Sequence, residues 1–238
     1  ELARPALARV YEGSAYAESA RLLDARYLLR SGRGEAALEA ALANAEAGHP
    51  RARRALADMY ASLERHAQAE PIYTALLAED DDNWTLYFAR AATRDAMGDW
   101  PAAEADLRKA LEFSPDQPEV LNYLGYTWVD RGENLQEGLA MIRRAVEQRP
   151  NSAAIIDSLG WAYYRLGDYR QALLFLERAV ELEPSSATLN DHLGDVYWRL
   201  GRRTEARFQW RRALTQDPDD AASIEAKLET GLPDPRAP

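Results

Sequence analysis

The chain has 238 residues, of which 47% are hydrophobic and 29% charged, and a formal net charge of −10. The absence of cysteine excludes disulfides, thiolate metal sites and cysteine nucleophiles. The acidic balance argues against nucleic acid as the main ligand, because phosphates repel an acidic surface. No run of about 18 apolar residues is present, so no membrane-spanning segment is predicted.

The first half of the chain reads as helical segments with a weak internal repeat. Residues 1–15 resemble the second half of a helix followed by a turn at Gly13, so we interpret them as the remnant of a preceding repeat and the chain as a fragment of a longer protein. A turn containing Gly32 and Gly34 divides the next segment into two helices. Helix pairs are predicted for residues 16–49, 50–83 and 84–117.

The second half of the chain contains three clear copies of one pattern. Each copy has a Leu-Gly pair, an aromatic residue three positions after that glycine, a second glycine and a terminal proline. The copies are spaced by 34 or 35 residues and occupy residues 118–152, 153–186 and 187–220. A fixed period of this size indicates stacked supersecondary units rather than one closed globular core.

The unit at 153–186 shows the physical meaning of the pattern. Ile156, Gly160 and Tyr163 are spaced so that they share one helix face. Gly160 is predicted to be small because a neighbouring helix passes close over it, which offsets the cost of about 1 kcal/mol for a glycine inside a helix. Gly167 is predicted to end the first helix, and Asp168 to cap the second.

This pattern resembles the tetratricopeptide repeat family. The resemblance implies an all-α fold, a right-handed superhelical α-solenoid of helix-turn-helix repeats in which the first helix of each repeat lines a concave groove. An array needs a covered end, so residues 221–231 are predicted to form a capping helix and residues 232–238 a mobile tail. The candidates for burial in that helix are Ala222, Ile224, Ala226 and Leu228.

The candidate binding site follows from the repeat positions that the resemblance places in the groove. Helix geometry puts the same positions on the stripe opposite the packed face. The resulting protein- or peptide-binding residues are Asn122, Tyr126, Asp157, Trp161, Tyr164, Asp191, Asp195 and Trp198. The alternative is that these aromatic residues pack between repeats as additional core.

The composition of this groove favours a protein or peptide partner with basic and apolar side chains. An acidic stripe would repel a terminal carboxylate, which argues against the carboxylate clamp of chaperone adaptors. The sequence contains no paired-histidine metal motif, nucleophile elbow or phosphate-binding loop, so we predict a non-catalytic scaffold or adaptor without metal or cofactor. Self-association, or an accessory role within a larger enzyme or assembly, is the alternative function.

A narrower resemblance concerns residues 121–214. The runs around Gly125, Gly160 and Gly194 are similar to the last repeats of bacterial tetratricopeptide lipoproteins that act as adaptors for a carboxyl-terminal processing protease. This resemblance implies a bacterial source and, if it extends to location, the periplasmic side of the outer membrane; otherwise the protein would be cytoplasmic. The partner does not follow from shared repeats.

Overall fold

The computed structural model describes residues 16–45 and 50–233, and every regular element in these ranges is an α-helix. The described chain divides into two compact units at Pro115 and Asp116. The prediction of an all-α fold of paired helices in the α-solenoid class is confirmed. The predicted repeat remnant at 1–15 lies outside the described residues, as do residues 234–238 of the predicted tail.

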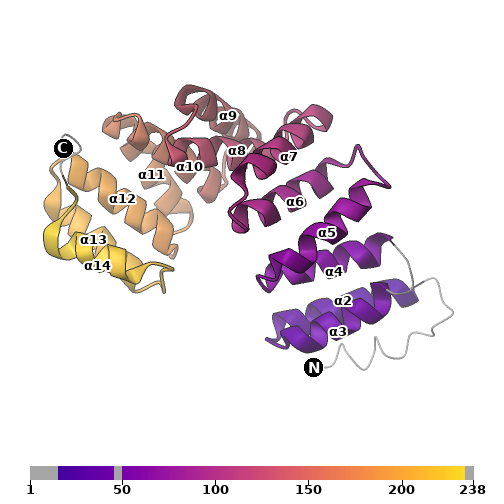
Figure 1. The fold of residues 1–238 in the computed structure, drawn as a ribbon. Helices are drawn as coiled ribbons and strands as arrows, with labels where there is room; N and C mark the ends of the chain where they lie inside the picture. Colours follow the sequence, from indigo (N-terminus) through magenta and orange to yellow (C-terminus); the bar gives the residue numbers. More distant parts are fainter. Residues whose placement is uncertain (1–15, 46–49, 234–238) are drawn as a thin grey trace. The chain divides into compact units, whose positions relative to one another are not determined.

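The described part of unit 1 contains three helix pairs, which Figure 1 labels α2 to α7. Their bounds are α2 Ala17–Arg30, α3 Gly34–Ala45, α4 Pro50–Ser62, α5 His66–Leu77, α6 Trp84–Ala96 and α7 Trp100–Phe113. Alanines such as Ala37, Ala57 and Ala69 are fully buried where helices pack. These small side chains allow close helix packing. Ala57 stands where the later repeats have the glycine of the Leu-Gly pair.

In unit 2, residues 116–233 form three further pairs and a final single helix (Figure 1). Their bounds are α8 Pro118–Arg131, α9 Leu135–Gln148, α10 Ala153–Arg165, α11 Tyr169–Leu182, α12 Ala187–Arg199, α13 Arg203–Leu214 and α14 Ala221–Thr230. The first helices α8, α10 and α12 contact one another in sequence, and each packs on its own second helix. Trp128 and Trp210 are among the largest fully buried side chains of this core.

The packing glycines lie where the sequence predicts close helix crossings. A Cβ atom added at Gly160 would lie 2.6 Å from Cγ of Leu176, and one added at Gly125 would lie 2.7 Å from the carbonyl oxygen of Gly138. At Gly194 the added atom would lie 2.5 Å from the Trp210 ring. The predicted role of Gly160 is therefore confirmed, because no larger residue fits at this crossing without movement of its neighbours.

The final helix differs in detail from the sequence prediction. It begins at Ala221, since the Asp220 carboxylate accepts a hydrogen bond from the Ser223 amide and caps it. Ile224 is buried and Leu228 is partly buried, whereas Ala222 and Ala226 are exposed, so the prediction of burial was wrong for both alanines. Residues 222 and 226 share one helix face and residues 224 and 228 share another, and this short helix buries only the second.

Candidate functional site

All eight predicted binding residues lie in unit 2, on the three first helices. We call the surface that they form, together with their immediate neighbours, the first-helix face. Helix α8 carries Asn122 and Tyr126; α10 carries Asp157, Trp161 and Tyr164; α12 carries Asp191, Asp195 and Trp198. The structure brings most of these residues into contact through neighbours one repeat away, several of which the sequence analysis did not single out.

Trp161 lies at the centre of the first-helix face and joins three helices. Its ring stacks on Tyr164 with centroids 4.6 Å apart, and on His192 of α12 with centroids 4.2 Å apart. Its Nε1 donates a hydrogen bond of 3.3 Å to the Asp130 carboxylate of α8. The side chain is only partly buried. Trp161 therefore packs between repeats and also leaves part of its surface open to a ligand.

Asp157 pairs with His192 across the boundary between two repeats. Nδ1 of His192 lies 3.0 Å from both carboxylate oxygens, and both side chains are buried. Burial by itself lowers the pKa of His192, but the Asp157 carboxylate together with those of Asp191 and Asp195 outweighs burial, and the pKa lies above its ordinary value. Asp157 is thus engaged within the chain rather than open to a partner.

Asp191 and Asp195 hold a lysine that the sequence analysis missed. Nζ of Lys227, on α14, lies 2.7 Å from Oδ2 of Asp191 and 3.0 Å from Oδ2 of Asp195. Asp195 also accepts a hydrogen bond of 2.9 Å from Nε1 of Trp210. Burial and the neighbouring Asp191 raise the pKa of Asp195, and the Lys227 ammonium opposes this shift.

Trp198 is covered by the segment that follows α14. Gly231, at a φ of 74°, turns the chain so that a Cβ atom there would lie only 1.7 Å from the Trp198 ring. Nε1 of Trp198 donates a hydrogen bond of 3.2 Å to the carbonyl oxygen of Leu232. Arg199 donates to the carbonyl oxygen of Pro233 and to the hydroxyl of Tyr164. The last repeat therefore binds the chain's own C-terminal segment on its first-helix face.

The two site residues of α8 have fewer partners. Oδ1 of Asn122 is buried and accepts no hydrogen bond from the described part of the chain. Tyr126 is partly buried, and burial together with the carboxylates of Asp130 and Asp157 raises its pKa to about 12. Its hydroxyl therefore stays protonated at neutral pH and can donate.

A sequence signal for the missed contacts does exist. The pairs Asp157–His192 and Asp191–Lys227 join residues 35 and 36 positions apart, which is close to one repeat length. Lys227 is moreover one of only two lysines in the chain. Extending the repeat register into α14 would have placed this lysine beside the carboxylates of α12.

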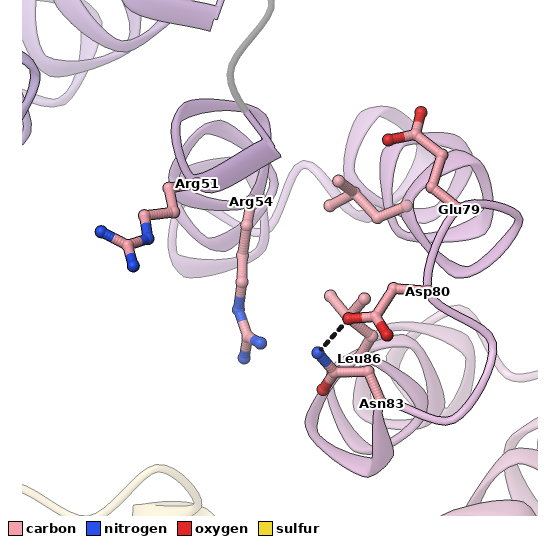
Figure 2. Close-up of a pocket in the computed structure, with 7 residues that line it drawn as sticks. Arg51, Arg54, Glu79, Asp80, Asn83 and Leu86 are labelled. Atoms are coloured by element: carbon pink, nitrogen blue, oxygen red, sulfur yellow. Dashed lines mark hydrogen bonds between the residues drawn. The ribbon is translucent and has the colours of Figure 1, made fainter.

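Unit 1 contains hollows for which the sequence analysis predicted no site. One, of about 490 Å³, lies beside the beginnings of α4 and α6 (Figure 2). Its charged and polar lining residues are Arg51, Arg54, Glu79, Asp80 and Asn83. Glu79 is held by a bidentate ion pair with Arg53, and Asp80 accepts a hydrogen bond from Asn83. Both signs of charge line this hollow, so it favours neither an anion nor a cation.

Among residues 16–45 and 50–233, no group of three or more histidine, aspartate or glutamate side chains is arranged to hold a metal ion. Within the same residues no helix is both long and apolar enough to cross a membrane. The chemistry of the first-helix face is instead that of carboxylates and aromatic rings, which recognise cations and apolar groups.

Within each unit, stacked helix pairs in which successive repeats contact each other define a helical-repeat protein. A family model for the tetratricopeptide repeat matches residues 19–83, 88–153 and 158–221, which make up most of the chain. The protein belongs to the tetratricopeptide repeat (TPR) family. Repeats of this family mediate protein–protein interactions, and such domains are typically non-catalytic scaffolds.

Two bacterial proteins are similar in sequence to parts of this chain. A TPR repeat-containing protein of Pseudomonas aeruginosa is 32% identical over 114 residues, which cover 47% of this chain and 19% of that protein. Bacteriophage adsorption protein A of Escherichia coli is 34% identical over 82 residues, which cover 34% of this chain and 8% of that protein. The matched segments therefore span less than a fifth of either relative.

Solved structures share the fold at low sequence identity. A chain of the APC/C hetero-tetramer Cut9-Hcn1 has a TM-score of 0.84 at 18% identity, covering 98% of this chain and 45% of its own length. A TPR protein of Parabacteroides merdae has a TM-score of 0.74 at 16% identity, and the match covers 95% of this chain and 90% of that protein. YrrB, described as a TPR protein with an unusual peptide-binding site, has a TM-score of 0.58 at 21% identity. The match covers 80% of this chain and 98% of YrrB.

Proposed function

We propose that this protein is a binding scaffold whose first-helix face in unit 2 holds a segment of a protein partner carrying basic and apolar side chains. The observation that carries the proposal is the contact with the chain's own C-terminal segment. There, Lys227 enters between two carboxylates, and Trp198 and Arg199 donate to backbone carbonyl oxygens of the segment. A partner segment with basic and apolar groups would meet aromatic rings and a free hydrogen-bond acceptor on α8 and α10.

Three side chains on α8 and α10 offer contacts to such a partner. The exposed part of Trp161 offers an aromatic surface for cation–π or apolar contact. The buried, unpartnered Oδ1 of Asn122 can accept a hydrogen bond from a side-chain amide, an ammonium or a backbone N–H. Tyr126 adds a protonated hydroxyl beside them. A donor-rich, partly apolar segment therefore complements this part of the first-helix face.

A randomised peptide library displayed against the full chain tests the proposal. We expect the retained peptides to be enriched in lysine or arginine next to leucine or an aromatic residue. Trp161→Ala should weaken their binding by about 2 kcal/mol, or roughly 30-fold, which is typical of an interface hot spot. Phe208→Ala is the matched control, because Phe208 is an aromatic residue 58% exposed on the second helix α13. Enrichment of acidic peptides, or equal losses from both variants, would reject the first-helix face as the site.

We further propose that the scaffold works in the bacterial envelope. Two features support this location: the resemblance of residues 121–214 to adaptor lipoproteins, and the similarity to a protein named for bacteriophage adsorption. Fractionation of cells that express the full-length, tagged gene product tests it. Recovery with the envelope is the expected result, and recovery only in the cytosolic fraction would remove this part of the proposal.

A further inference from the structure

A second hollow in unit 1 lies on the surface that corresponds to the first-helix face of unit 2. It has a volume of about 420 Å³ and is lined by α4, the beginning of α5, and α6. Asp58 of α4 and Ala92 of α6 directly follow Ala57 and Ala91, which stand where later repeats have the glycine of the Leu-Gly pair. In unit 2 the equivalent positions include the large rings of Tyr126 and Trp161. Small residues therefore leave space in unit 1 where unit 2 is filled.

The hollow contains two hydrogen-bond acceptors with unused capacity. Oδ1 of Asp58 accepts a hydrogen bond of 2.7 Å from the Tyr73 hydroxyl. Oδ2 lies 3.8 Å from Nε of Arg54, which is too long for a hydrogen bond, and Nη1 of this arginine donates instead to Thr85. Nδ1 of His66 is buried and has no partner in the described part of the chain. With its proton on Nε2, this imidazole offers Nδ1 as an acceptor.

The hydroxyl groups of the hollow do not offer donors. Ser62 donates to the carbonyl oxygen of Asp58, and Thr93 donates to that of Ala89, each within its own helix. The remaining lining includes the methyl groups of Ala61, Ala89 and Ala92. The hollow thus combines one carboxylate and one unpartnered imidazole nitrogen with apolar walls, while its serine and threonine hydroxyls donate within their own helices.

A ligand that fits must donate hydrogen bonds and gains further from a positive charge. A lysine side chain meets both demands, since its ammonium has three donors and its stem is apolar, and an arginine guanidinium does so with five. The long contact between Arg54 and Asp58 does not prevent this, because exposed ion pairs contribute little. Within the same chain, Lys227 already binds between carboxylates on the equivalent helix of the last repeat.

We propose that this hollow binds the side chain of a lysine or arginine from a protein partner. The proposal rests on the proposed function, because it requires a partner segment that runs over first helices. It adds a separate site within unit 1, where Asp58 and His66 recognise a cationic side chain and the three alanines enclose its stem.

Nuclear magnetic resonance of the full chain with labelled alanine methyl groups tests the hollow directly. The probe is Nα-acetyl-lysine methylamide, and the neutral Nα-acetyl-norleucine methylamide is its matched control. We expect the lysine compound to shift the methyl signals of Ala61, Ala89 and Ala92 in a saturable way. The norleucine compound should leave these signals unchanged. Equal shifts with both compounds, or no shift with either, would overturn the proposal.

Variants make the test specific for the two acceptors. Asp58→Asn should weaken binding of the lysine compound severalfold, and its amide oxygen can still accept from Tyr73, so the local fold is kept. His66→Leu should weaken binding severalfold. Asp82→Asn, an exposed change in the same unit, should bind like the parent. Parent-like binding by both Asp58→Asn and His66→Leu would overturn the assignment.

The outcome is separable from that of the peptide library, which reports on Trp161 in unit 2. If the library retains basic peptides but the lysine compound fails, only the hollow in unit 1 is rejected. If the lysine compound binds but the library yields no basic peptides, the hollow stands as a cation site and the partner segment is rejected.

Discussion

Replacing Lys227 with methionine should destabilise the protein strongly. The methionine keeps most of the apolar stem but leaves Asp191 and Asp195 together without their shared cation. The side chains of Lys227, Asp191 and Asp195 are only 16%, 19% and 6% exposed, so water can replace little of the lost interaction. Removing one partner of a buried ion pair typically costs about 3–5 kcal/mol, and we expect about 3 kcal/mol here. That loss corresponds to a Tm lower by roughly 9 °C.

The loss should depend on pH in a defined direction. Burial and Asp191 already raise the folded-state pKa of Asp195, and removing Lys227 raises it further. A carboxyl group with a raised folded-state pKa contributes stability below its unfolded pKa of about 3.9 and loses that contribution as the pH rises through the folded value. The difference in free energy of unfolding between the Lys227→Met variant and the parent should therefore be largest at neutral pH and become smaller as the pH falls.

Urea unfolding followed by far-UV circular dichroism, at about pH 7 and about pH 5, measures both effects. Lys109→Met is the matched control, because Lys109 is the other lysine of the chain and its ion pair with Glu112 is exposed. This control should be near neutral. A Lys227→Met variant as stable as the parent at pH 7, or a gap that widens on acidification, would refute the role assigned to this lysine.

Three further changes have defined outcomes. Gly160→Leu should lower the free energy of unfolding by about 2 kcal/mol in chemical denaturation, since its Cβ would lie 2.6 Å from Leu176 Cγ; parent-like stability would contradict the close crossing. Trp161→Ala should cost about 1–2 kcal/mol through loss of two ring stacks while keeping helicity and tertiary packing. Loss of the near-UV circular dichroism signal, the mark of a molten chain, would instead make it a core residue. The pKa of His192 is raised by Asp157, so the contribution of His192 to stability is present below about pH 6.5 and is lost as the pH rises through the folded-state pKa. His192→Leu should abolish this pH dependence in thermal melts recorded across the pH range. If the pH dependence persists in the variant, another group is responsible for it.

The helix pairs and their crossings could be predicted because the information lies within one repeat. Gly160 shows this: its helix, its packing face and its small size all follow from the spacing of its neighbours in sequence. Asp168 likewise caps the second helix of its repeat, where its carboxylate accepts a hydrogen bond from the Gln171 amide. Such features depend on residues a few positions apart, so periodicity and propensity determine them.

The state of the site residues could not be predicted, because it depends on partners one repeat away. The sequence predicts that Asp157, Asp191 and Asp195 lie on a binding face, but only the structure shows that the first pairs with His192 and the other two with Lys227. A helix pattern specifies the direction of a side chain and not the group that meets it.

The buried face of the terminal helix α14 also could not be predicted from the sequence. The sequence prediction gave burial to Ala222, Ile224, Ala226 and Leu228 alike, although these residues lie on two different stripes of the helix. The tertiary structure buries the second stripe and turns Lys227 toward α12. The sequence by itself therefore determined the repeats and the face that they present, whereas tertiary contacts decided which polar groups on that face are already paired. The physical reason is that hydrophobic periodicity is local, while the pairing of buried charges is set by atoms that meet only after the repeats stack.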